Sequence, residues 1–221
     1  MRQIIGSPAE LGREIARQLR RAVEKNPNAA FGFAAVDVPR EVYAAIAESG
    51  VDFSGCAAFN CCEYVGEPKQ LNALKEELFD KTPFASVHTP AEGEDYDAEI
   101  RAAGGLEIVV LGIGERGHVA FCEPGVDFGS NTYLSKLAEV TRKNAAEDFG
   151  ALENVPTHGL TMGMGTILNA RHVFLVACGE DKANAVLKTL TGRPETFIPA
   201  SFLQLHMDVE VYLDDAAAAK L

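Results

Sequence analysis

Short apolar runs alternate along the chain with segments that have the apolar spacing of amphipathic helices. The runs are typical of strands buried on both faces of a parallel sheet. They cover residues 31–36, 56–62, 106–111, 172–177 and 209–213, and a further short strand is expected over 137–141. Helices are expected over 7–24, 39–49, 68–79, 96–103, 180–190 and 199–205, with a short helix ending near 169 and a terminal helix from 214. This alternation predicts an α/β fold, a doubly wound, mostly parallel sheet with helices on both faces.

The first helix has the clearest start signal. Ser7 and Glu10 form the pattern of a capping box, and Pro8 stands at the first helical position. No internal repeat, low-complexity linker or compositional break divides the 221 residues, a length that suits one α/β domain. We therefore expect a single domain over residues 1–221.

The stretch from Leu106 to Gly125, LEIVVLGIGERGHVAFCEPG, joins the most apolar strand to a set of chemically useful residues. Glycines follow the strand where the backbone must turn sharply or let a ligand come close. His118 and Glu123 come next, just beyond the carboxyl end of the strand. Ligands bind at that edge in open α/β sheets, so we expect the functional site here.

Gly112, Gly114 and Gly117 also match the G-x-G-x-x-G pattern of dinucleotide-binding turns. That fingerprint requires a full helix after the third glycine. Pro124 and Gly125 would end any helix there after about two turns. A dinucleotide site is therefore the weaker interpretation of these glycines.

Composition and charge exclude several classes of protein. The net charge of −12 argues against nucleic acid, whose phosphates would be repelled. No run of about 18 apolar residues could cross a membrane, and the start lacks the apolar core of a signal peptide, so we expect a cytoplasmic protein. The five cysteines are irregularly spaced, which argues against a disulfide framework and a zinc site. We expect no metal and no cofactor.

The segment GIGERGHVAFCEPG resembles the signature of glucosamine-6-phosphate deaminases, also called isomerases, which is close to G-[IV]-G-x-[DN]-G-H-[IV]-[AG]-F-N-E-P. Three more segments are similar to the same family in the same order, at 59–68, 155–168 and 199–221. The resemblance implies a Rossmann-like fold and an amino-sugar phosphate substrate. It also implies a reaction that opens the sugar ring, moves a proton between C2 and C1, and releases ammonia to leave fructose 6-phosphate. A homo-oligomer is left open.

The resemblance also assigns roles to individual residues. His118 matches the ring-opening histidine and Glu123 its carboxylate partner, and a histidine is a good proton shuttle because its pKa lies near neutrality. Lys182 matches the phosphate-binding lysine, at a helix start whose amides would add to the attraction. Arg142 matches an arginine that contacts the substrate. Gly114 and Gly117 are expected to let the substrate approach the backbone. The alternative for the charged residues is an ordinary structural or surface position.

Two segments depart from the family pattern. Cys62 stands where the family has the aspartate that acts as base at C2, in N-x-D-E-Y-x-G. A thiol titrates about four units higher than a carboxylic acid, and it could act as a base only beside cations that favour the thiolate. The loop GFAAVDVP at 32–39 replaces a phosphate loop similar to G-L-[AP]-T-G-G-T-P. Asp37 there puts a negative charge where a phosphate would lie, and the two charges would repel.

Two single positions also differ. Arg116 replaces the Asp or Asn of the signature, and it either returns positive charge to the pocket or points into solvent. Asn131 replaces an arginine that some relatives use for an allosteric effector, so we expect no such regulation.

Three functions follow from these observations. The favoured one is a glucosamine-6-phosphate deaminase/isomerase-type enzyme that acts on a hexosamine 6-phosphate through His118, Glu123 and Cys62, with Lys182, Arg142, Arg116 and the glycines binding substrate. The second is a non-catalytic sugar-phosphate sensor or assembly protein on the same fold. The third is a 6-phosphogluconolactonase-like hydrolase, which would need no base at C2.

Overall fold

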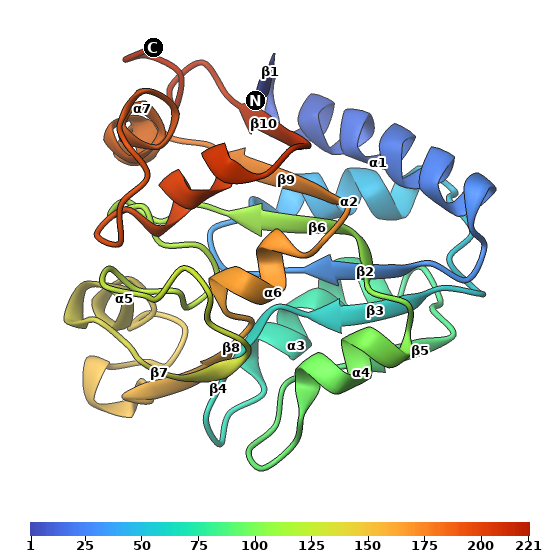
Figure 1. The fold of residues 1–221 in the computed structure, drawn as a ribbon, viewed down its shortest axis with the longest axis horizontal. Coiled ribbons are helices and arrows are strands. Elements are labelled where there is room, and N and C mark those ends of the chain that lie inside the picture. Colours follow the sequence, from blue (N-terminus) through green and yellow to red (C-terminus); the bar gives the residue numbers. More distant parts are fainter.

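A seven-stranded, wholly parallel sheet forms the centre of the structure, a computed structural model that describes residues 1–221 (Figure 1). Its strand order is β1-β10-β9-β6-β2-β3-β5. The strands are β1 (Arg2–Ile5), β2 (Ala30–Phe33), β3 (Ala57–Asn60), β5 (Ser86–His88), β6 (Leu106–Gly112), β9 (His172–Ala177) and β10 (Val209–Leu213). A smaller antiparallel sheet has the order β4-β8-β7, formed by β4 (Cys62–Tyr64), β7 (Tyr133–Lys136) and β8 (His158–Thr161).

Helices cover both faces of the large sheet, so the predicted doubly wound α/β fold is confirmed. On one face lie α1 (Pro8–Lys25), α2 (Arg40–Glu48) and α3 (Lys69–Leu74), which runs on into the π-helical turn η1 (Lys75–Phe79). The other face packs against α4 (Tyr96–Ala102), α6 (Met164–Leu168), α7 (Ala183–Thr191), the 3₁₀ helix η4 (Pro199–Leu205) and the smaller sheet. The remaining helices are α5 (Glu139–Asn144), η2 (Leu152–Asn154) and η3 (Glu180–Lys182).

Strand β6 lies at the middle of the sheet, and all seven of its residues are buried. Its neighbours are β2 on one side and β9 on the other. From β2 the chain winds outward through β3 to β5, and from β6 it winds the opposite way through β9 to β10. The strand order therefore reverses between β2 and β6. Ligands bind at such a reversal, beyond the carboxyl ends of the strands.

The predicted strand over 56–62 is really two strands in different sheets. The Cys61 amide donates to the Phe33 carbonyl of the large sheet, while the Cys61 carbonyl accepts from Met162, next to the small sheet. The chain crosses from one sheet to the other at this residue. The burial pattern carries no signal for such a crossing, because Asn60 before it and Cys62 after it are equally buried.

Two other expectations were wrong. Residues 137–141 do not form a strand: β7 ends at Lys136, and α5 begins at Glu139. The real strand has mostly exposed side chains and so lacks an apolar pattern. The segment from Asp214 forms turns instead of a helix, although Ala217 is buried in the core; the Asp214 carboxylate accepts from the Ala217 amide there. Strands β1 and β5, the two short strands at the edges of the sheet, were not predicted from the sequence.

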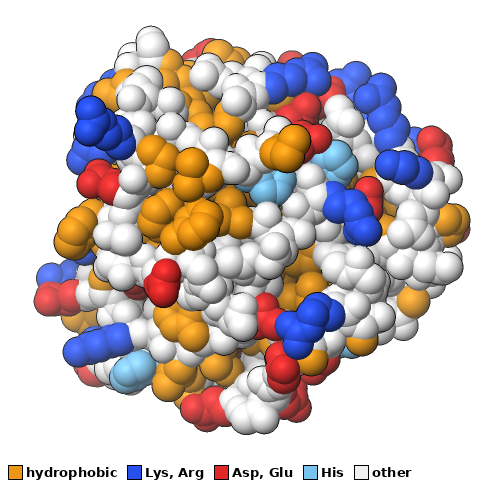
Figure 2. All heavy atoms as spheres, viewed as in Figure 1, with side chains coloured by type: hydrophobic (Ala, Val, Ile, Leu, Met, Phe, Trp, Pro, Cys, Tyr) orange, Lys and Arg blue, Asp and Glu red, His pale blue; other side chains and the backbone are white.

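The face shown in Figure 2 carries an area of apolar side chains in front of η4. Exposed apolar residues in and near η4 are Phe197 and Leu205, and Phe128 packs against Phe202 with ring centroids 5.2 Å apart. None of these side chains lines the pocket described below. No helix has the length and apolar character needed to cross a membrane.

Candidate functional site

The loops that follow β2, β6 and β9 meet where the strand order reverses. Asp37 lies in the loop after β2, His118 in the turn after β6, and Lys182 in η3 after β9. The Asp37 carboxylate joins the other two side chains: its Oδ2 lies 2.9 Å from His118 Nε2, and its Oδ1 accepts a hydrogen bond of 2.7 Å from Lys182 Nζ. These three residues are called the carboxyl-edge triad below.

The glycines of the 112–117 motif make room for this contact. A Cβ atom on Gly114 would lie 1.9 Å from His118 Cε1, and one on Gly112 would lie 2.3 Å from the carbonyl carbon of Asp37. Gly117 has a φ of +80° and closes the turn by donating from its amide to the Gly114 carbonyl. No helix follows Gly117. The glycines thus leave space for the His118 imidazole and for the loop that carries Asp37, and not for a dinucleotide.

The neighbours of Asp37 hold it in its ionised form. Burial would raise its pKa, but the hydrogen bond and charge of His118 and the charge of Lys182 outweigh that, so the pKa of Asp37 falls to about 2. Burial likewise opposes the charge on Lys182, yet the Asp37 carboxylate prevails and raises the pKa of Lys182. Lys182 also contacts Asp181 at 3.1 Å. The triad is therefore an ion pair with an imidazole attached.

Glu123 makes no hydrogen bond to His118. Its Oε1 accepts from the Ala138 amide at 2.9 Å and from the Thr141 hydroxyl at 2.6 Å, which fixes the start of α5. Its Oε2 and His118 Nδ1 are both buried and have no hydrogen-bond partner. Such atoms are rare in folded proteins and are typical of sites that bind a ligand or move a proton.

Cys62 lies in the core with no exposed surface. Burial and the nearby acidic groups raise the pKa of its thiol well above the usual range. The carboxylate of the neighbouring Glu63 is already hydrogen-bonded. It accepts hydrogen bonds from the backbone amides of Tyr64, Gln70 and Leu71, the last two at the start of α3. Neither side chain offers a base to a ligand.

Arg142 and Arg116 lie outside the triad. The Arg142 guanidinium donates to the backbone carbonyls of Val155 and Leu152, at 2.9 Å and 3.1 Å, so it holds two segments of the chain together. Arg116 is exposed, and so is Asn131. Of the residues that the sequence singles out, the structure therefore brings together His118, Lys182 and Asp37, with Gly114 beneath the imidazole.

A pocket of about 450 Å³ opens beside the triad, within the size range of small-molecule sites. His118 and Asp37 line it, as do the aromatic rings of Tyr64 and Phe149. Polar and charged side chains from α2, α3, η1, α5 and the turn after α5 complete its wall; they are Arg40, Lys69, Gln70, Asn72, Glu76, Glu77, Thr141, Asn144 and Asp148. Lys182 and Cys62 are not among the lining residues. Apart from Tyr64, which lies in a segment of the family resemblance, these wall residues carry no sequence signal.

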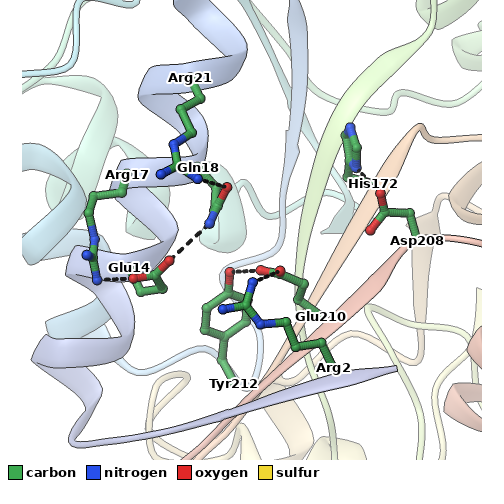
Figure 3. Close-up of polar contacts among 9 residues, drawn as sticks. All are labelled: Arg2, Glu14, Arg17, Gln18, Arg21, His172, Asp208, Glu210 and Tyr212. Carbon is green, nitrogen blue, oxygen red and sulfur yellow. Dashed lines mark hydrogen bonds and ion pairs between the residues drawn. The ribbon is translucent and has the colours of Figure 1, made fainter.

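The amino edge of the sheet has a second, smaller polar pocket of about 220 Å³ beside α1 (Figure 3). His172 Nδ1 lies 2.8 Å from Asp208 Oδ2 there, and these two residues are called the amino-edge pair below. Nearby, Glu210 contacts Arg2 and Tyr212, and Glu14 contacts Arg17 and Gln18. Each ion pair of this cluster includes an exposed partner: Glu14 and Glu210, which are largely buried, pair with exposed arginines, and His172 and Asp208 are both exposed, as on an ordinary protein surface. No group of three or more His, Cys, Asp or Glu residues is arranged to hold a metal ion anywhere in the chain.

Comparison with known proteins places this geometry in a family. The family model described as glucosamine-6-phosphate isomerases/6-phosphogluconolactonase matches residues 7–212. The glucosamine-6-phosphate deaminase of Pseudarthrobacter chlorophenolicus is 38% identical over 236 aligned residues, which cover 99% of this chain and 91% of that protein. The protein of the same name from Latilactobacillus sakei is 40% identical over 204 residues, 86% of each chain.

Solved structures agree with these relatives. A monomeric glucosamine-6-phosphate deaminase superposes with a TM-score of 0.91 at 30% identity over the whole of both chains. The 6-phosphogluconolactonase of Trypanosoma brucei superposes with a TM-score of 0.80 at 17% identity, over all of this chain and 98% of that one, which shows a shared fold alone. By sequence and by structure, the chain belongs to the family of glucosamine-6-phosphate isomerases and 6-phosphogluconolactonases.

Proposed function

We propose that this protein is an amino-sugar enzyme of the deaminase/isomerase type, with its active site in the pocket beside the carboxyl-edge triad. The reaction converts a hexosamine and water into a ketohexose and ammonia through an aldose–ketose shift of a proton from C2 to C1. The observation that carries the proposal is the position of His118, which lines the pocket at the sheet reversal with its imidazole held by Asp37. The sequence relatives named above are deaminases.

The pocket offers two proton carriers to a bound sugar. The His118 imidazole suits ring opening, because it can give a proton to the ring oxygen and take one from the C1 hydroxyl. The Asp37 carboxylate is the acidic group in contact with it, and Asp37 is therefore the remaining base for C2 now that Cys62 is buried. A carboxylate with a pKa of about 2 is a weak base, so we expect turnover to be slow.

A coupled assay for ammonia and ketose tests the proposal. Glucosamine and glucosamine 6-phosphate would each be incubated with the protein, and ammonia and ketose would be measured in parallel. We expect both products in equal amounts, at a rate that His118→Gln lowers about 10²- to 10⁴-fold. Neither product from either sugar would refute the proposal.

The burial of Cys62 favours a second candidate, a non-catalytic sugar-binding protein on the same fold. In that case calorimetry would record saturable binding of a hexosamine, and the coupled assay would detect no ammonia. A lactonase activity has less support, because the likeness to 6-phosphogluconolactonases is one of fold.

We also propose that a single chain, as one domain over residues 1–221, is the functional unit. The similar solved deaminase is itself described as monomeric. Size-exclusion chromatography with light scattering tests this, and activity confined to an oligomer would contradict it.

A further inference from the structure

The wall of the candidate pocket carries more negative than positive charge. Four carboxylates line it, against two permanently cationic side chains and the imidazole of His118; the acids are Asp37, Glu76, Glu77 and Asp148, and the cations are Arg40 and Lys69. The whole chain has a net charge of −12, so the surroundings do not reverse this balance. A pocket with this lining attracts cations and repels anions.

Both cations of the wall are already engaged. Arg40 Nε lies 3.6 Å from Glu77 Oε1. Lys69 Nζ donates to the Asp148 carbonyl at 2.7 Å and lies 5.0 Å from the centre of the Phe149 ring. Lys182, the nearest other cation, is paired with Asp37 and Asp181. An anionic ligand would therefore have to share these cations with the acidic and carbonyl groups that already contact them.

The loop after β2 offers an anion no side-chain donor. Residues 34–38 are Ala-Ala-Val-Asp-Val and have no hydroxyl group. The Ala34 amide donates to the Val110 carbonyl, and the Val38 amide donates to the Ala35 carbonyl. Asp37, whose φ is 59°, turns its carboxylate onto both Lys182 and His118. The carboxylate thus fills the position in which an anion would be bound.

The same wall contains a free acceptor. Gln70 lines the pocket, and its side-chain oxygen Oε1 is buried and has no hydrogen-bond partner. A buried acceptor without a partner costs free energy that a ligand N–H or O–H would recover. Tyr64 and Phe149 add aromatic surface for the apolar face of a sugar ring.

We propose that the ligand of this pocket is a cationic amino sugar without a phosphate group, and that the Asp37 carboxylate takes the place of the phosphate as the counter-ion of Lys182. This inference rests on the proposed function for the sugar part of the ligand. A phosphate monoester carries a charge of about −1.5 to −2 at neutral pH, which the four carboxylates oppose. An ammonium group gains from them and can donate to Gln70.

Calorimetric titration with a set of matched sugars tests the inference. The probes are glucosamine, glucose and glucosamine 6-phosphate, at about pH 6.5 so that the amine is protonated. We expect glucosamine to bind about tenfold more tightly than either of the others, with an affinity that falls as salt is added. Tighter binding of glucosamine 6-phosphate than of glucosamine would overturn the inference.

The outcomes separate this inference from the proposed function. Ammonia released from glucosamine 6-phosphate alone would overturn the inference and leave the function standing. Binding of glucosamine without ammonia release would support the inference and remove the enzymatic function. Failure of both hexosamines to bind would overturn both.

A substitution in the triad sharpens the test. Asp37→Asn keeps the size of the side chain, and asparagine tolerates a positive φ, while Lys182 loses its main counter-ion. We expect the affinity for glucosamine 6-phosphate to rise about tenfold, and Asp208→Asn, at the amino edge, to leave it unchanged. An unchanged affinity in Asp37→Asn would contradict the inference.

A second variant tests the inference without changing any residue of the triad. Glu76 is exposed at the pocket wall, so Glu76→Gln should fold normally. It should weaken glucosamine binding and strengthen glucosamine 6-phosphate binding, each about twofold, since a screened surface charge contributes a few tenths of a kcal/mol. A change of the opposite sign for either ligand would count against the inference.

Discussion

Two histidine–aspartate pairs lie at opposite edges of the same sheet and have nearly the same geometry. His118 and Asp37 are 2.9 Å apart at the carboxyl edge, and His172 and Asp208 are 2.8 Å apart at the amino edge. Their exposure differs sharply: the side chains are 5% and 17% exposed in the first pair, but 37% and 53% exposed in the second. Contact distance alone therefore does not distinguish a candidate active site from an ordinary pair of polar side chains on the surface.

The difference lies in what surrounds each pair. Water screens the amino-edge pair, so its attraction contributes little to stability. At the carboxyl edge Lys182 joins the pair, burial removes most of the water, and the pKa of Asp37 falls to about 2. Substitutions made in parallel at the two edges can therefore separate catalysis and stability from ordinary surface effects.

The largest expected effect is on turnover. His118→Gln keeps a donor near Asp37 but cannot move a proton, so the rate of ammonia release should fall about 10²- to 10⁴-fold. His172→Asn, the matched change at the amino edge, should leave the rate within a factor of two. The coupled assay measures both. Equal losses in the two variants would show that the edges do not differ in function.

The next effect is on stability. Asp37→Asn leaves the partly buried ammonium of Lys182 with only Asp181 beside it, and we expect the free energy of unfolding to fall by about 3 kcal/mol. Asp208→Asn removes an exposed charge and should change it by less than about 0.5 kcal/mol. Urea unfolding followed by circular dichroism gives both values. If the loss in Asp37→Asn were as small as that in Asp208→Asn, the triad would contribute no more than a surface pair.

Part of this site could be predicted from the sequence and part could not, for physical reasons. His118 was predicted because it follows the most apolar strand within a dense local motif, and the fold followed from the order of the apolar runs. The contact between Asp37 and His118 was not predicted, because the residues are 81 positions apart. It depends on the pairing of β2 with β6 and on the space that Gly112 leaves for the loop.

Two roles that the family resemblance assigns do not fit the geometry, one because of a local turn and the other because of burial. Glu123 is only five positions from His118, yet its carboxylate turns toward Thr141. Cys62 holds the position of a catalytic residue, but the crossing of the chain at Cys61 leaves it in the core. Neither the direction of a carboxylate after a turn nor the closure of a core over a thiol can be predicted from residue identity.

The pH dependence of stability sharpens the comparison further. The pKa of Asp37 is lower in the folded chain, about 2, than its ordinary value of 3.8. The unfolded state therefore binds the proton first, and the contribution of Asp37 is complete above about pH 5 and is lost as the pH falls toward 2, a change of about 2 kcal/mol. The other carboxylates of the chain also titrate in this range.

The difference between the wild type and Asp37→Asn isolates the contribution of Asp37. The unfolding free energy of the wild type should drop more steeply between pH 5 and pH 2 than that of the variant. Asp208→Asn should keep the steepness of the wild type. Parallel curves for the wild type and Asp37→Asn would mean that the triad does not stabilise the ionised carboxylate.

The smallest expected effect follows from a change in the packing of the His118 ring against Gly114. Gly114→Ala puts a methyl group where the His118 ring lies, since the new Cβ would be 1.9 Å from Cε1. The ring must move, and overpacking of this kind costs about 1.5 kcal/mol, or about 5 °C in melting temperature for a chain of this length. Gly129→Ala is the control, because the nearest atom to its Cβ is 4.0 Å away.

Calorimetry should show a loss of stability in Gly114→Ala only. Ammonia release should also be slower in that variant, because a displaced imidazole no longer contacts Asp37. A normal rate in Gly114→Ala would mean that the contact between His118 and Asp37 is not needed for the reaction. The two histidine–aspartate pairs would then differ in burial and stability but not in catalysis.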